Sequence, residues 1–130
     1  MGTRFIAMKV APAHDNVKQA LVAASELQTR LIMRPLRNTE RVLTNATVEE
    51  ILAIERDKGA ATTIEDIRHL IGGAGNRRVL QDGDLDAGAW SCGIVAGLIH
   101  DIPTCTELID RIMAGAQAII SSHLESLLAA

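Results

Sequence analysis

The chain has 130 residues, of which 48% are hydrophobic and 22% are charged, and its net charge at pH 7 is −3. This length suits one domain with a core of its own, and the slightly acidic charge argues against a nucleic-acid-binding protein. Aromatic residues amount to only 2%, so the core must be aliphatic and nucleic-acid bases would find no stacking platform.

The first half of the chain predicts a strand end, a helix and a short extended segment. Residues 1–5 (Met-Gly-Thr-Arg-Phe) read as the end of a β-strand with a Gly-Thr turn, where glycine lets the backbone approach an anion closely. A helix is predicted from Asp15, as its N-cap, to about Leu27, because apolar residues recur there at helical spacing. Residues 29–33 predict a strand or an extended connection, which Pro35 ends.

The middle of the chain predicts two helices with clear start and stop signals. A Thr-x-x-Glu capping box opens a helix over 47–58, which Gly59 ends. A second helix is expected over 63–71, stopped by the glycine pair that follows it. Residues 78–80 predict a short extended piece, and residues 82–88 predict an acidic loop.

The last third predicts two further helices. One spans 89–100, and Thr104 and Glu107 form a capping box that opens the longest helix, running to Leu128. One broad face of this last helix is apolar or nearly so, being formed by Leu108, Ile112, Met113, Ala116, Ile119, His123 and Leu127. The chain is therefore expected to be mostly helical, with two or three short strands.

Several residue groups have the composition of a functional site but the wrong spacing. An EF-hand loop is imitated by Asp82, Asp84 and Asp86, but glycine and glutamate are missing from its sixth and twelfth positions. The four histidines are scattered without metal-ligand spacing, and no catalytic base can be assigned. A cluster of arginines is formed by Arg30, Arg34, Arg37 and Arg41. It could bind an anion, although a solvated surface is the favoured interpretation. We predict neither a metal site nor a catalytic residue in this chain.

The two cysteines, Cys92 and Cys105, are too few for a zinc site or a disulfide framework. We expect both to be buried free thiols, although a place near a helix N-terminus would lower the pKa of Cys92.

Nothing in the sequence points to a membrane or to export. The first residues lack the apolar core of a signal peptide, and the longest apolar stretch, residues 94–99, is too short to cross a bilayer. We expect a cytoplasmic protein without nucleic-acid or membrane partners.

The most specific internal signal lies between Asp86 and Thr104. Small residues at Gly93 and Gly97 would let a flat ring or another backbone approach closely, and Ser91 places a hydroxyl at the expected helix start. On spacing alone, tight packing against a neighbouring strand explains this pattern at least as well as a ligand does.

Residues 1–5 and 86–104 together resemble the C-terminal part of the nitronate monooxygenase family, formerly called 2-nitropropane dioxygenases. The stretches 14–21 and 34–39 are similar to the same family, so the resemblance covers nearly the whole chain. The family consists of FMN-dependent (β/α)8 barrels, which implies an α/β fold of which this chain is an incomplete segment.

The resemblance also implies how the chain divides. Residues 1–12 would be the end of the last barrel strand with its phosphate turn, and residues 13–80 a helical segment that covers the substrate. Residues 81–130 would be a return loop followed by the C-terminal barrel helices. The family's remaining strands would lie before Met1, so the chain resembles a fragment.

The implied cofactor is FMN. Its phosphate would lie at Gly2 and Thr3, and its flavin ring would be bordered by Trp90, Ser91 and Gly93. No position here matches the family's catalytic histidine, so we expect the chain to bind FMN weakly and to be inactive alone.

The implied activity is the oxidative denitrification of an alkyl nitronate with oxygen. Two alternatives remain open: an FMN-dependent enoyl-carrier-protein reductase, which shares the barrel, and a non-enzymatic helical fragment that forms homo-oligomers.

Overall fold

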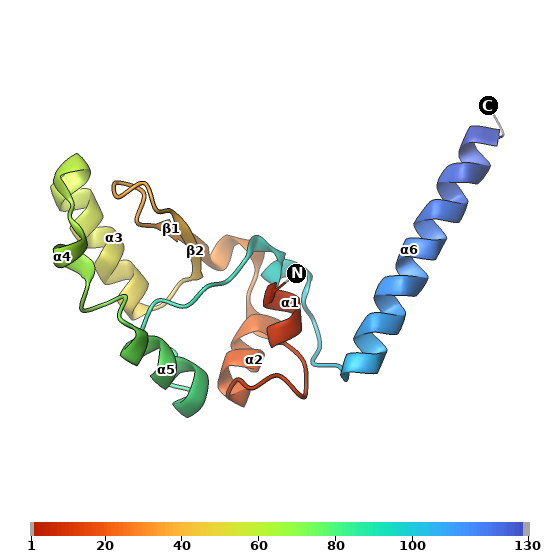
Figure 1. The fold of residues 1–130 in the computed structure, drawn as a ribbon, viewed down its shortest axis with the longest axis horizontal. Coiled ribbons are helices and arrows are strands. Elements are labelled where there is room, and N and C mark those ends of the chain that lie inside the picture. Colours follow the sequence, from red (N-terminus) through yellow and green to blue (C-terminus); the bar gives the residue numbers. More distant parts are fainter. Residues whose placement is uncertain (1, 129–130) are drawn as a thin grey trace.

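The computed structural model describes residues 2–128, with side-chain surroundings to residue 122. Figure 1 shows α3 and α4 at one end beside a hairpin of β1 and β2, then α1, α2 and α5 in the middle, and α6 projecting from the other end. The α-helices are α1 (Gly2–Ile6), α2 (Asp15–Ala23), α3 (Ala46–Lys58), α4 (Ile64–Ile67), α5 (Gly73–Asp82) and α6 (Cys105–Leu128). The strands are β1 (Thr29–Ile32) and β2 (Glu40–Leu43), and the short 3-10 helices are η1 (Glu26–Gln28), η2 (Gly59–Ala61) and η3 (Ile94–Leu98). The prediction of a mostly helical chain with short strands is confirmed.

Residues 2–6 form a helix, so the predicted strand end at residues 1–5 is wrong for the described part of that segment. A strand needs a neighbouring strand for its backbone hydrogen bonds, and within residues 2–128 the two strands pair with each other. The Ala7 N–H instead donates locally to the Thr3 carbonyl, at 3.4 Å.

Helix α2 is shorter than predicted, and its cap is one residue earlier. His14, not Asp15, is the N-cap: its Nδ1 accepts from the Asn16 N–H at 3.1 Å. The helix ends before Ser25, because Ser25 and Gln28 form the capping box of η1 and hold the next turn in a separate helix.

The predicted strand at 29–33 is confirmed as β1, and its antiparallel partner β2 was not predicted. Thr29 pairs with Leu43 and Ile32 with Glu40. The connecting loop begins at Met33, a left-handed residue with φ 59°, whose N–H donates to the buried Glu55 carboxylate of α3 at 2.5 Å. The Glu55 carboxylate thus accepts the hydrogen bond that the Met33 N–H would otherwise donate to a neighbouring strand.

Helix α3 begins at Ala46 because Asn45 is its N-cap, accepting from the Val48 N–H at 2.8 Å. The predicted cap, Thr47, instead donates from Oγ1 to the Asp86 carbonyl at 2.5 Å. The Asn45 amide donates to the Gly88 carbonyl at 2.9 Å and so ties the loop before residue 89 to the start of α3. The predicted end at Gly59 is confirmed, with φ 53°.

Helix α4 is a short form of the predicted helix over 63–71. Its Thr63–Asp66 capping box is present, and the hydrogen bond from Lys58 together with those from Thr63 lowers the pKa of Asp66 to about 2. The extended piece predicted at 78–80 is wrong, because those residues lie inside α5, which ends at the left-handed Gly83.

The helix predicted over 89–100 is also wrong. Residues 90–92 run extended along the free edge of β2, where the Cys92 N–H donates to the Arg41 carbonyl at 3.0 Å and the Leu43 N–H to the Trp90 carbonyl at 3.3 Å. Only the 3-10 helix η3 follows. Pairing with β2 supplies the backbone bonds that a helix would have made internally.

Two groups of buried side chains form the core. The first joins α2, η3 and the segment before η3: Ala7, Val17, Leu21, Leu43, Val79, Trp90, Cys92, Ala96 and Ile99. The second joins the hairpin to α3 and α4: Ile32, Met33, Val42, Val48, Ile51, Ile67 and Ala89. Nearly all are aliphatic, as the composition required.

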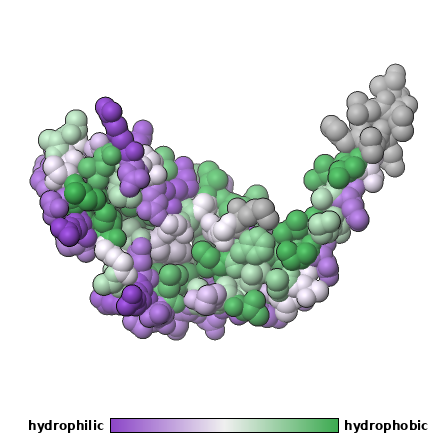
Figure 2. Space-filling view, viewed as in Figure 1, coloured by the Kyte–Doolittle hydropathy of each residue, from purple (hydrophilic) through white to green (hydrophobic). Residues whose placement is uncertain are grey.

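Helix α6 starts with the predicted capping box, in which the Glu107 N–H donates to Thr104 Oγ1 at 3.2 Å and the Thr104 N–H to Glu107 Oε2 at 2.7 Å. Among its side chains up to residue 122, only Leu108 is buried. Figure 2 shows apolar surface along the projecting helix. The outer part of the predicted apolar face, His123 and Leu127, lies beyond the described side chains.

Candidate functional site

The two stretches predicted to hold a cofactor lie together in space. The Gly93 N–H donates to Thr3 Oγ1 at 2.9 Å, across 90 positions of sequence. Glycine is suited to this place because a Cβ on Gly93 would lie 3.3 Å from the same oxygen. Since Thr3 Oγ1 accepts this bond, its own proton remains available for a ligand.

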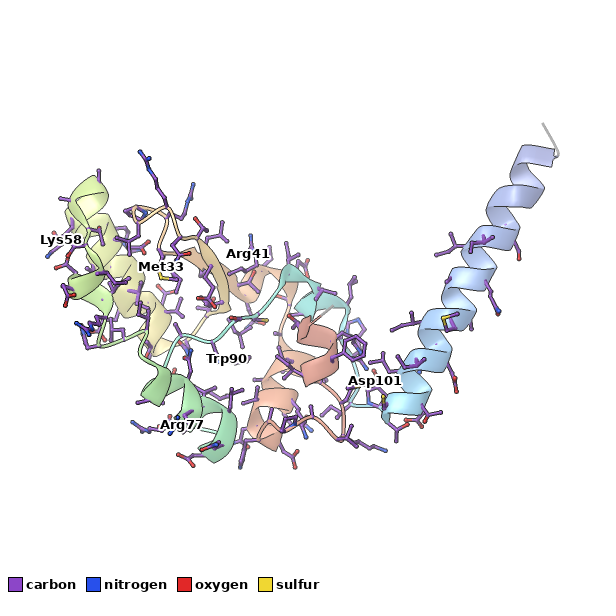
Figure 3. The ribbon with its side chains drawn as sticks, in the orientation of Figure 1. Met33, Arg41, Lys58, Arg77, Trp90 and Asp101 are labelled. Atoms are coloured by element: carbon purple, nitrogen blue, oxygen red, sulfur yellow. The ribbon has the colours of Figure 1, made fainter. Side chains whose placement is uncertain are left out.

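An ion-pair network holds α1 in position. Arg4 Nη2 lies 2.8 Å from Asp101 Oδ1, and Arg4 Nη1 donates to the Asp101 carbonyl at 3.0 Å. Arg111 of α6 donates to the other Asp101 oxygen, at 2.5 Å. The Arg111 hydrogen bond, helped by Arg4, holds the pKa of Asp101 below its usual value. Figure 3 shows Asp101 in the connection that leads into α6.

Trp90 and Ser91 lie in the extended segment beside β2. Trp90 is 4% exposed, and its Nε1 has no hydrogen-bond partner among the described residues. Ser91 is exposed, and its hydroxyl donates to the Glu40 carboxylate of β2. Figure 3 shows Trp90 in the middle part of the molecule.

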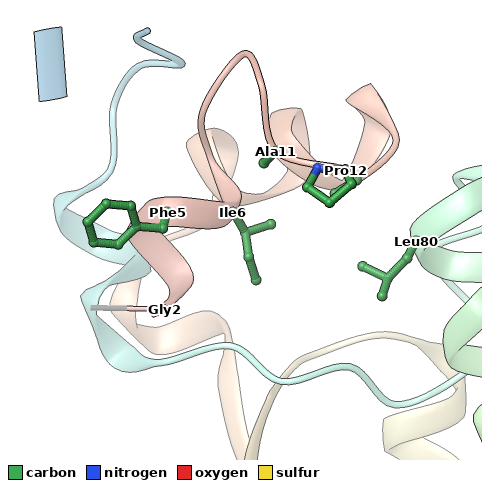
Figure 4. Close-up of a pocket in the computed structure, with 7 residues that line it drawn as sticks. Gly2, Phe5, Ile6, Ala11, Pro12 and Leu80 are labelled. Carbon is green, nitrogen blue, oxygen red and sulfur yellow. The ribbon is translucent and has the colours of Figure 1, made fainter. Parts of the chain in front are cut away.

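Two neighbouring hollows lie between α1 and α5. The larger, of about 290 Å³, is shown in Figure 4 and is lined by Gly2, Phe5, Ile6, Ala11, Pro12, Ala13 and Leu80. The smaller, of about 230 Å³, is lined by Ile6, Asn76, Leu80, Trp90 and Ser91. Both share Ile6 and Leu80, so one ligand could extend from Gly2 to Trp90.

The lining of these hollows suits a flat, largely apolar ligand with few polar anchors. None of the lining residues is charged. A phosphate near Gly2 would therefore depend on backbone N–H groups and on the Thr3 hydroxyl, and the first N–H groups of a helix have no partners within it.

The residues present fit one side of an FMN site. A Cβ added to Gly2 would meet nothing within 4 Å, which leaves room for a ligand group against the backbone. The unpartnered Nε1 of Trp90 is a donor of the kind that a bound ring carbonyl would satisfy. Of the five predicted residues, Gly2, Trp90 and Ser91 line the hollows, and Thr3 and Gly93 bond to each other beside them.

The cysteines differ from each other, contrary to prediction. Cys92 is buried, and burial raises the pKa of its thiol to about 11, the opposite of the lowered pKa considered from the sequence. Cys105 is exposed rather than buried. Neither cysteine lines the two hollows.

Within the described residues, no group of His, Cys, Asp and Glu side chains could hold a metal ion. No helix in that part of the chain is long and apolar enough to cross a membrane.

Sequence reasoning missed Asn76, Ile6 and Leu80, which come from helices it did not predict. The nearest signal was the glycine-rich run before Asn76, interpreted as a helix stop. In the structure, a Cβ on Gly75 would overlap the Ala87 carbonyl, so this run permits close packing of α5 against the segment that carries Trp90.

Comparisons with known proteins bear on the family and the fold of the chain. Residues 1–115 match the family model described as nitronate monooxygenase. A structure of FabK from Thermotoga maritima is similar with a TM-score of 0.82 and 26% identity, over 94% of this chain and 37% of that one. A point mutant of the same FabK matches with a TM-score of 0.74 and 25% identity, over 94% and 35%.

The chain therefore spans little more than a third of the length of these structures. The matches imply an α/β barrel fold, although residues 2–128 form no closed barrel themselves. Because the family model matches residues 1–115, which is most of this chain, the chain belongs to the nitronate monooxygenase family.

Proposed function

We propose that the chain forms one wall of the flavin site in an FMN-dependent oxidoreductase of the nitronate monooxygenase type. The observation that carries this proposal is the hydrogen bond between Gly93 N–H and Thr3 Oγ1, which joins the start of α1, where we propose that the phosphate binds, to the segment that we propose borders the flavin. The adjoining hollows run from Gly2 to Trp90 beside that bond.

Each residue has a distinct role in this proposal. The Gly2 backbone and the Thr3 hydroxyl bind the phosphate, while Trp90, Ser91 and Gly93 orient the ring. Bound FMN would supply electron transfer between a nitronate substrate and oxygen. The chain's own contribution is to bind the cofactor and, with its apolar side chains, to exclude water from one side.

The proposed phosphate site at Gly2 and Thr3 can be tested by comparing FMN with riboflavin, which lacks the phosphate. We expect weak binding of FMN to the 130-residue chain, yet binding about 10-fold or more tighter than riboflavin, because hydrogen bonds to a charged group are strong. Gly2→Val should remove this preference, since its side chain would occupy the open space at Gly2. The measurement is quenching of flavin fluorescence.

Gly115→Val is the matched control, because Gly115 is also a helical glycine with no atom within 4 Å of an added Cβ and lies on α6. It should leave the preference for FMN intact. Equal affinity for FMN and riboflavin in the unaltered chain would refute the proposed phosphate site at Gly2 and Thr3.

A second candidate, an FMN-dependent enoyl-carrier-protein reductase, is favoured by the apolar lining of both hollows, which suits an acyl chain. The absorbance band of FMN bound to the chain distinguishes the two. A shift on adding propyl-2-nitronate, and none on adding an enoyl thioester, supports the nitronate; the reverse result supports the reductase.

A further inference from the structure

The smaller hollow has two buried polar atoms in its walls that lack partners. Trp90 Nε1 is a donor and Asn76 Oδ1 is an acceptor, and neither makes a hydrogen bond within the described part of the chain. Both side chains line this one hollow. Buried polar atoms are normally paired because losing hydration without a replacement bond is costly, so such a pair indicates a missing partner.

The backbone holds Asn76 against the segment that leads into Trp90. A Cβ on Gly88 would lie 2.8 Å from Asn76 Oδ1 and 2.9 Å from the Asn76 nitrogen, and one on Gly75 would overlap the Ala87 carbonyl. Only glycine at both positions allows the first turn of α5 to approach the segment that leads into Trp90. The Asn45 amide fixes that segment further by its bond to the Gly88 carbonyl.

The chemistry of the missing partner follows from the two atoms. Trp90 Nε1 requires an acceptor, and Asn76 Oδ1 requires a donor. A primary-amide or imide edge offers a carbonyl beside an N–H and satisfies both, whereas an ordinary trans secondary amide points the two groups in opposite directions. A nitronate group carries acceptor oxygens only, so it would leave Asn76 Oδ1 unpaired.

We propose that Asn76 and Trp90 form a binding site for the primary-amide or imide edge of a ligand in the smaller hollow. The proposal rests on the function proposed above, because this hollow adjoins the one that begins at Gly2. Two sources offer this edge: the imide of the flavin ring, or a primary amide in a substrate.

The test uses the one tryptophan of the chain, whose indole N–H gives a single cross-peak in a ¹⁵N-correlated NMR spectrum of the 130-residue protein. The probes are FMN, FMN methylated at its imide nitrogen, and benzamide, which carries a primary amide but no flavin. We expect FMN or benzamide to move the indole peak saturably. If FMN is the ligand, the methylated form should bind about 5- to 10-fold more weakly, the effect of one neutral hydrogen bond.

Asn76→Leu should weaken the active probe by a similar factor, because leucine has nearly the same size without polar atoms. Asn38→Leu is the matched control: Asn38 is exposed in the hairpin loop, and the change should leave the affinity unaltered. The methylated FMN tests the same bond without any mutation, should Asn76→Leu fail to fold.

The outcomes separate this inference from the proposed function. If FMN binds equally well to the unaltered chain and to Asn76→Leu and benzamide does not bind, the Asn76–Trp90 site is wrong while the flavin site stands. If benzamide alone moves the indole peak and Asn76→Leu weakens its binding, the Asn76–Trp90 site stands and the FMN function fails. If no probe moves the peak, both fail, and ordered water is the partner of the two atoms.

Discussion

At the scale of single residues, burial separates two side chains of identical chemistry. Cys92 is 1% exposed among aliphatic neighbours, and desolvation of the thiolate raises the pKa of its thiol to about 11. Cys105 begins α6 and is exposed. Because the thiolate is the nucleophile, the two should differ strongly in reactivity.

Iodoacetamide at pH 8 should therefore modify Cys105 and leave Cys92 unmodified in the folded protein. Intact-mass spectrometry should show one adduct on the unaltered chain and none on Cys105→Ser, and two adducts on the unaltered chain after unfolding in urea. Rapid modification of folded Cys105→Ser would show that Cys92 is accessible and contradict the buried position.

The raised pKa of Cys92 also predicts a pH dependence of stability. The folded pKa of about 11 lies above the reference value of 9.0, so the folded state keeps a proton that the unfolded chain loses first. This contribution to stability is fully present below pH 9 and is lost as the pH rises towards 11. Urea unfolding at pH 8 and pH 10.5 should show a smaller loss of stability in Cys92→Ala than in the unaltered chain.

At the scale of elements, the first turn of α5 contains two glycines in opposite surroundings. A Cβ on Gly75 would overlap the Ala87 carbonyl, whereas one on Gly73 would meet nothing within 4 Å. Helix propensity favours alanine over glycine at both positions, so only the tertiary contact distinguishes them.

Gly75→Ala should lower the free energy of unfolding by about 1–3 kcal/mol, the usual cost of overpacking. The matched change Gly73→Ala should leave it unchanged or raise it by up to about 1 kcal/mol, through helix propensity alone. Urea unfolding followed by circular dichroism measures both. Equal effects of the two changes would mean that α5 does not pack closely on the segment containing Ala87.

Among the described residues, sequence patterns predicted four of the six α-helices and one of the two strands, but fewer of the residues at which they begin and end. Capping boxes and stop glycines act within about four residues. The capping box at Thr104, the helix start at Thr63 and the stop at Gly59 were predicted correctly. The caps at His14 and Asn45 were each displaced by one or two residues. The segment 89–100 has an apolar pattern that fits a helix, yet the open edge of β2 made its first part extended.

At the scale of the whole molecule, α6 carries an apolar face that the rest of the described chain does not cover. Its exposed apolar side chains are Ile109, Ile112, Met113, Ile119 and Ile120. Figures 1 and 2 show this helix projecting with apolar surface along it. Such a face favours association with another protein surface. We propose that the partner is a second copy of this chain, so that the protein forms homo-oligomers.

Ile119→Glu should therefore shift the protein from oligomers towards monomers, because Ile119 is 69% exposed and a charge would be buried in the contact. Gln117→Glu adds the same charge at an exposed polar position of α6 and should have little effect. Sedimentation velocity at micromolar concentration measures the difference. A monomeric unaltered chain would contradict this proposal and the non-enzymatic alternative that depends on it.

The sequence by itself determined the family, the aliphatic core and the helix starts that depend on nearby caps; the five residues expected at the cofactor stay a prediction. These signals reside in motifs or in neighbours within one helical turn. Only the tertiary structure decided that residues 2–6 are helical, that residues 90–92 pair with β2, and that Asn76 and Trp90 line the same hollow. Those outcomes depend on which distant backbone supplies the missing hydrogen bonds, and no local periodicity specifies that partner.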